Sequence, residues 1–99
     1  MTRVDQKGKR LLEGFITAEQ CRAARGAVAW SQGDLADAAR LSRPTVQEFE
    51  RGARATHENN LVALRTALET KGVRFWELED GRLGLDFPAD RPFQTDKYG

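Results

Sequence analysis

The chain is poor in the residues that make cross-links and metal sites. Its 99 residues include one cysteine, Cys21, and one histidine, His57. A single cysteine excludes an internal disulfide framework and fits a reducing compartment, so we expect a cytoplasmic protein. One cysteine with one histidine also falls short of the ligand set of a structural zinc site. The sequence therefore predicts a core held by apolar packing, with no metal and no cofactor.

Long hydrophobic runs and an excess of one charge are also missing. No stretch approaches the roughly 20 apolar residues that span a bilayer, and no apolar signal-peptide segment follows the basic start. The formal net charge is +1, which by itself indicates no particular partner. The length suits one domain with one small core. We therefore expect a soluble protein without a membrane partner.

Residues typical of N-caps divide the middle of the chain into short helices. Thr17, Ser31 and Ser42 are the three caps, and the first opens a helix over about residues 18–28. Pro44 lies in the first turn after Ser42, where a missing N–H costs little. The spacing predicts a mainly α protein of four or five short helices.

A fourth helix is predicted after a polar loop. Its apolar stripe consists of Leu61, Leu64 and Leu68, and Gly72 ends it. The pattern then changes to two strand-like runs around an Asp-Gly pair at 80–81, which favours a two-residue hairpin turn. This turn would place four residues on one apolar face: Trp76, Leu78, Leu83 and Leu85. That face would pack on its own helices or on a second chain.

These patterns divide the chain into four segments. Residues 1–14 are predicted to be a flexible basic arm, 15–72 the helical domain, 73–87 the hairpin and 88–99 a disordered tail. We expect the arm to add phosphate contacts through Arg3, Lys7, Lys9 and Arg10.

Two short capped helices between Ser31 and Gly52 form the pattern of a helix-turn-helix. Ala36 is small where the helices approach each other, and the second helix is held by Leu35, Leu41, Val46 and Phe49. Its outer face then consists of Arg43, Pro44, Thr45, Gln47, Glu48 and Arg51. A short helix with such side chains can enter the DNA major groove, where guanidinium and amide groups bond base edges.

The stretch WSQGDLADAARLSRPTVQEFERG resembles the core signature of the lambda-repressor-like, Xre-type family of bacterial and phage regulators. The similarity runs from Ile16 to Phe75. It implies a lambda-repressor-like bundle of four or five short helices with a C-terminal β-hairpin. It also implies a transcriptional regulator, such as a repressor, that binds double-stranded DNA and is not an enzyme.

The resemblance implies roles for single residues. Base contacts are expected from Arg43, Pro44, Thr45, Gln47 and Glu48, although Glu48 could equally exclude wrong bases. Backbone contacts are expected from Gln32, Arg40, Arg51 and Arg54. Arg25 and Glu50 resemble a buried ion pair of this family. Arg40 stands where the family usually has a glycine with positive φ, so we expect slight strain there. The alternative for each contact residue is a solvated surface position.

Partner predictions follow from the small size of one helix-turn-helix, which favours a homodimer on two half-sites about 34 Å apart. The candidate dimer residues are Trp76, Leu78, Leu83 and Leu85, or the outer edge of the hairpin. The alternative is an antitoxin-like or adaptor protein that binds a partner such as a toxin through Phe87, Phe93 and Tyr98. An enzyme is the least favoured class, because His57 lacks the second histidine of HExxH and Cys21 is expected to be a buried, inert thiol.

Overall fold

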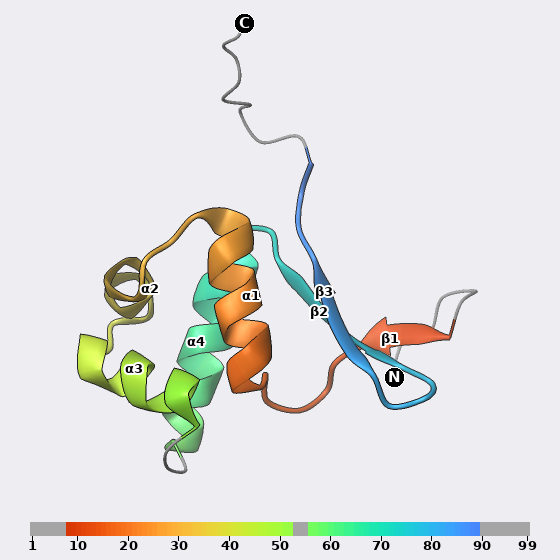
Figure 1. Ribbon diagram of the computed structural model, residues 1–99, viewed down its shortest axis with the longest axis horizontal. Helices are drawn as coiled ribbons and strands as arrows, with labels where there is room; N and C mark the ends of the chain where they lie inside the picture. The colour runs from red at the N-terminus through yellow and green to blue at the C-terminus, as the bar shows by residue number, and fades with distance from the viewer. Residues whose placement is uncertain (1–7, 53–55, 90–99) are drawn as a thin grey trace, which may run out of the picture.

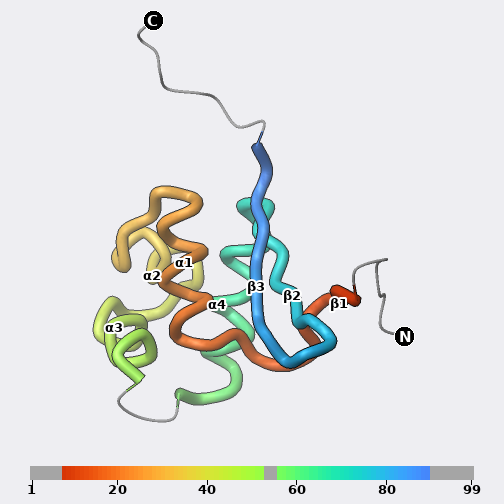
Figure 2. The backbone as a smooth tube through the Cα atoms, turned by 45° about the vertical axis from the view of Figure 1, so that its right-hand side comes forward, coloured from red at the N-terminus to blue at the C-terminus, as the bar shows by residue number. Residues whose placement is uncertain are grey.

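The computed structural model describes residues 8–52 and 56–89. It contains the helices α1 (Ala18–Val28), α2 (Gln32–Ala39), α3 (Arg43–Arg51) and α4 (Glu58–Thr70) and the strands β1 (Lys9–Leu11), β2 (Arg74–Leu78) and β3 (Leu83–Asp86). In Figures 1 and 2, α1 and α4 lie between the sheet on one side and α2 and α3 on the other. The prediction of a mainly α fold is confirmed.

The predicted caps start the first three helices. The side-chain oxygens of Thr17, Ser31 and Ser42 each accept a backbone N–H three residues further on. At Thr17 and Ser31 the reciprocal bond of a capping box is also present. Gly52 and Gly72 follow α3 and α4 with positive φ, as the sequence predicts. Local side-chain chemistry therefore sets most helix boundaries.

The core lies between the helices and the inner face of the sheet. Its members are buried apolar residues from every helix and from β2 and the segments beside it: Leu12, Ile16, Cys21, Ala24, Leu35, Ala36, Val46, Leu64, Ala67, Leu68, Val73 and Phe75. Phe75 is the largest fully buried side chain. Leu41 and Phe49 pack against this cluster and are only partly buried. The residues predicted to hold α3 at its angle therefore do face the core.

The predicted hairpin register is wrong by one residue. Trp76 pairs with Gly84 and Phe75 with Leu85, and the loop has three residues because Leu78 N–H bonds the carbonyl of Arg82. A three-residue loop with a glycine of positive φ at its end, here Gly81 (φ +90), is a common hairpin form.

The corrected register separates the dimer candidates. Opposite residues in a sheet share a face, so Leu83 and Leu85 lie with Phe75, while Trp76 and Leu78 lie on the other face. The prediction that one apolar face contains Trp76, Leu78, Leu83 and Leu85 is therefore wrong. The reason is that Phe75 is fully buried, and its burial fixes which face of β2 points toward α1 and α4.

A third strand is the second difference from the sequence. Residues 9–11, predicted as part of a flexible arm, form β1, which pairs antiparallel with β2 in a sheet of order β1-β2-β3. Leu12 extends this pairing, because its N–H bonds the carbonyl of Phe75 at 2.9 Å. The prediction of a flexible arm is therefore wrong for this part. Arg3, Lys7 and the tail from 90 onward lie outside the described residues.

None of the helices in the described part of the chain has both the length and the apolar character that a membrane crossing requires.

Candidate nucleic-acid interface

Helix α3 has one face committed to the core and one turned to solvent. Val46 is fully buried and Glu50 is 3% exposed. The exposed residues of the helix are Arg43, Pro44, Gln47, Glu48 and Arg51, and Thr45 is half-buried. Thr45 shares a hydrogen bond of 2.8 Å with the Ser42 hydroxyl at the start of the helix. The structure thus places four of the five predicted base-contacting residues on the exposed face, with Thr45 half-buried beside them.

Of the four long polar side chains on the exposed face, two have partners and two have none among the described residues. Arg51 bonds Glu48 at 2.7 Å, one turn away on the surface. Arg43 and Gln47 make no side-chain hydrogen bond or ion pair with any residue in the described ranges. Long polar side chains without an internal partner can turn toward a ligand without breaking a bond in the protein.

The carboxylate of Glu50 joins three helices beneath this face. Arg25 of α1 donates from Nε at 2.7 Å and from Nη2 at 2.8 Å, one bond to each oxygen. Gln32 of α2 donates from Nε2 at 3.0 Å, and the Cys21 thiol donates at 3.1 Å. Arg22 donates to the backbone carbonyl of Glu50. The predicted Arg25–Glu50 pair is therefore present as the centre of a larger cluster.

Electrostatics in this cluster favour the ionised carboxylate. Burial raises the pKa of Glu50, but the hydrogen bonds from Arg25, Cys21 and Gln32 outweigh it, and the pKa lies below its usual value. The bond to Glu50 raises the pKa of Arg25. Burial, with the bond to Glu50, raises the pKa of the Cys21 thiol. Cys21 is thus a buried thiol, as the sequence predicts.

Gln32 and Arg22 have roles that sequence reasoning missed. The sequence analysis predicts only a DNA-backbone contact for Gln32, whereas in the structure its amide donates to Glu50. Arg22 precedes Arg25 by three residues, so both lie on one face of α1. That spacing was the available signal for Arg22. Both residues fix the end of α3 against the first two helices.

The turn between α2 and α3 contains the strained residue that the sequence predicts. Arg40 has φ 60 and ψ 43, the left-handed conformation that usually selects glycine. Ala29, after α1, has the same conformation with φ 60. The Arg40 side chain is exposed next to α3. Arg54, the remaining predicted backbone contact, lies outside the described residues.

The basic residues of β1 do not join this face. Lys9 lies 4.2 Å above the Trp76 ring and 3.7 Å from Asp86, and Arg10 lies 3.5 Å from Glu77. Figure 1 shows β1 at the side of the molecule opposite α3. These two cations therefore lie away from any ligand held by α3.

Two short capped helices joined by a tight turn, with an exposed polar face on the second helix, define a helix-turn-helix domain. A family model described as helix-turn-helix matches residues 22–75, which is more than half of the chain. The chain belongs to this family, which is the lambda-repressor-like, Xre type, and its domain is that of a DNA-binding regulator. Among curated proteins, none matches the chain.

Proposed function

We propose that the chain is a sequence-specific transcriptional regulator that binds an inverted repeat in double-stranded DNA as a homodimer, with α3 in the major groove. The observation that carries this proposal is the outer face of α3. Its side chains project from a helix whose opposite side is fixed by Val46 and by the Glu50 cluster. A helix held in this way presents its side chains in one fixed orientation, which base reading requires.

Base reading is assigned to the N-terminal half of α3. Arg43, the first residue of the helix and exposed, has a guanidinium that can bond O6 and N7 of guanine together. Gln47 lies one turn further along the same side and has an amide suited to adenine. Glu48 bonds Arg51 in the free protein, so its role is to limit which bases are accepted.

Phosphate contacts are assigned to residues around α3. The Gln32 amide has a second N–H that the bond to Glu50 does not use. It lies at the N-terminus of α2, where the helix dipole favours an anion. Arg40 and Arg51 are exposed at the two ends of α3. Contacts of this kind fix the register of the helix in the groove and carry no sequence information.

The proposal is tested by selecting bound sequences from a random DNA pool with the full chain. We expect enrichment of an inverted repeat whose half-sites are about 34 Å apart. Enrichment of a single unpaired half-site would remove the homodimer from the proposal. Recovery of unrelated sequences, with binding abolished by moderate salt, would contradict sequence-specific reading.

A toxin-binding role remains the second hypothesis. Its predicted anchors Phe93 and Tyr98 lie outside the described residues, and Phe87 is 42% exposed. The structure describes only one of the three predicted toxin-binding anchors, whereas it describes the whole outer face of α3. We therefore favour the DNA-binding role.

A further inference from the structure

The edge strand β3 has backbone groups that no strand of the described chain uses. Leu78 N–H bonds the carbonyl of Arg82 toward β3, while Leu12 N–H bonds the carbonyl of Phe75 on the other side of β2. Bonding alternates along antiparallel strands, so Gly84 and Asp86 direct their N–H and C=O groups toward β2. Leu83 and Leu85 therefore direct theirs to the free edge. An exposed edge of this kind is a template for a further strand.

The sequence along this edge is complementary to itself. Residues 82–86 read Arg-Leu-Gly-Leu-Asp. If a second copy pairs antiparallel about Gly84, each Arg82 lies opposite the Asp86 of the other copy, and each Leu83 lies opposite a Leu85. The two glycines meet at the centre, in a pair that makes no backbone bonds and has the shorter Cα separation. A parallel arrangement would instead place like charges together, which is unfavourable.

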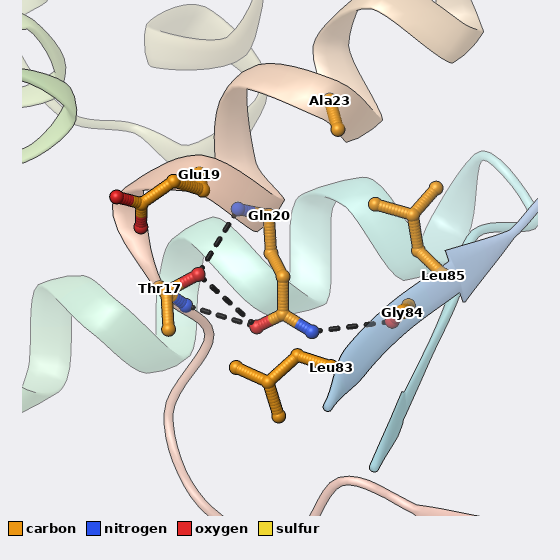
Figure 3. A pocket seen from close by; sticks show the side chains of 7 residues that line it. All are labelled: Thr17, Glu19, Gln20, Ala23, Leu83, Gly84 and Leu85. Carbon is orange, nitrogen blue, oxygen red and sulfur yellow. Dashed lines mark hydrogen bonds between the residues drawn. The ribbon is translucent and has the colours of Figure 1, made fainter. Parts of the chain in front are cut away.

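The space beside the edge is open and mostly apolar. A groove of about 400 Å³ is lined by Thr17, Glu19, Gln20 and Ala23 of the α1 segment and by Leu83, Gly84 and Leu85. Figure 3 shows Gln20 reaching from α1 to the carbonyl of Gly84, with Leu83 and Leu85 on either side. Leu83 is 42% exposed. The edge thus combines free backbone groups with uncovered leucine surface.

The position of α3 agrees with such pairing. Two antiparallel strands are related by a two-fold axis that runs perpendicular to their sheet. In Figures 1 and 2 the sheet lies at one side of α1 and α4, and α3 lies at the other. An axis through Gly84 perpendicular to the sheet therefore has both copies of α3 at the same end of the dimer. An inverted repeat requires this arrangement.

We propose that β3 is the homodimer interface, and that a second copy of the chain adds its β3 antiparallel about Gly84 to form one six-stranded sheet. This inference rests on the proposed function, because it is binding to one DNA duplex that requires both α3 helices to lie on the same side of the dimer. It deepens that function, because it assigns the interface to Arg82, Leu83, Leu85 and Asp86. The surface Arg82–Asp86 pairs set register, since exposed ion pairs add little affinity.

The first test is a disulfide across the proposed axis. A Cβ at Gly84 meets no atom within 4 Å, so Gly84→Cys is compatible with the fold, and opposed strand positions lie at disulfide distance. In a glutathione buffer, the full chain with G84C should become a covalent dimer. The wild type, whose Cys21 is buried, and Leu11→Cys on the opposite edge strand should not. Equal cross-linking of G84C and L11C, or none with G84C, overturns the proposal.

The second test exchanges charges and measures the dimer dissociation constant by analytical ultracentrifugation. Arg82→Asp and Asp86→Arg should each weaken the dimer about tenfold, because like charges then face each other in both symmetric pairs. The double variant R82D/D86R should restore dimerisation. Asp86 also accepts a bond from Trp76 within its own chain, so restoration in the double variant is the deciding result. A double variant as weak as the single ones overturns the proposed register.

DNA binding by the same preparations separates this inference from the proposed function. Sequence-specific binding to an inverted repeat without cross-linking at position 84 overturns the edge pairing and leaves the proposed function standing. Cross-linking at position 84 without DNA binding supports the edge pairing and counts against the proposed function.

Discussion

At the scale of single residues, the Glu50 carboxylate has the largest structural role. It is 3% exposed and accepts side-chain bonds from α1 and α2. A buried charge is costly unless its bonding capacity is filled, and here the donors come from the helices that must hold α3 in place. The stability of the domain and the orientation of its outer helix face therefore depend on the same group.

Replacing Glu50 with glutamine should lower the free energy of unfolding by about 3–5 kcal/mol, because Arg25 keeps its charge in a site that no longer compensates it. The matched control is Glu48→Gln, which breaks an exposed pair with Arg51 and should cost less than about 1 kcal/mol. Urea unfolding at neutral pH measures both. Equal losses in the two variants would contradict the structural role of the buried carboxylate.

The same residue predicts an acid dependence. The pKa of Glu50 is lowered in the folded chain, so the folded state binds the proton less readily than the unfolded state. Its contribution to stability is fully present above the ordinary value of about 4.3 and declines as pH falls through the lowered value. Unfolding free energies measured down this range should fall less steeply in Glu50→Gln than in the wild type. Parallel curves would contradict the assignment.

At Arg40, the effect of backbone strain on stability can be measured separately from the effect of the side chain on DNA binding. Glycine relieves the left-handed conformation, so Arg40→Gly should gain about 1 kcal/mol of stability, and Ala29→Gly, with the same φ of 60, should gain a similar amount. Only Arg40→Gly should weaken DNA binding and reduce its salt dependence, by about one phosphate contact. Thermal unfolding and salt titrations distinguish the two variants. Unchanged DNA binding in Arg40→Gly would remove Arg40 from the interface.

The site residues predictable from sequence are those that the family resemblance marks. The Arg25–Glu50 pair is implied by the family resemblance and also interrupts two apolar stripes, and Arg40 stands where the family usually has a glycine. The bonds of Cys21 and Gln32 to Glu50 have no such signal, because they depend on how three helices meet, and Arg22 has only its spacing of three residues from Arg25.

At the scale of elements, helices were predicted well and strands poorly. The first three helices begin at side-chain caps within a few residues of the predicted positions, whereas the hairpin register depends on which side chain the core accepts. The pair Asp80-Gly81 fits both a two-residue and a three-residue loop, and the burial of Phe75 decides between them. The strand β1 has only three residues, too few for a period to be recognised.

The corrected register makes a direct prediction about two neighbouring aromatic residues. Phe75→Ala should cost about 3–5 kcal/mol of stability, because Phe75 is fully buried. Trp76→Ala should cost clearly less, since Trp76 lies on the outer face with Lys9 above its ring and Asp86 bonded to its Nε1. Urea unfolding followed by circular dichroism compares them. A larger loss for Trp76→Ala would support the register that the Asp-Gly pair suggested.

At the scale of the whole molecule, the helical layer of α1 and α4 lies between the proposed DNA-binding face and the proposed dimer edge. The outer face of α3 is at one side and the edge of β3 is in the sheet at the other (Figure 2). Because the two surfaces are separate, the proposed DNA contact and the proposed pairing of two copies do not compete for the same residues. The fold class and the face of α3 were predictable from sequence, but the relation between the two surfaces required the three-dimensional arrangement of the sheet.

A rigid dimer predicts a strict spacing of half-sites. Inserting about five base pairs, half a helical turn, between the half-sites turns one of them to the opposite side of the duplex. Affinity should then fall to that of a single half-site. Inserting a full turn restores the relative orientation of the half-sites but separates them farther than a rigid dimer spans, so affinity should fall there too. Fluorescence anisotropy with the spaced duplexes measures this. Equal affinity for all spacings would contradict a rigid two-fold arrangement.

The central claim is that α3 reads bases through Arg43, and the most direct test is to repeat the random-pool selection with Arg43→Ala beside Arg22→Ala. Arg22 contacts Glu50 at the back of the helix and serves as the control arginine. We predict that Arg43→Ala still binds but loses its preference at one base pair of each half-site, a discrimination of about 1–3 kcal/mol, while Arg22→Ala keeps the wild-type motif. An unchanged motif in Arg43→Ala would contradict the assignment of α3 as the recognition helix.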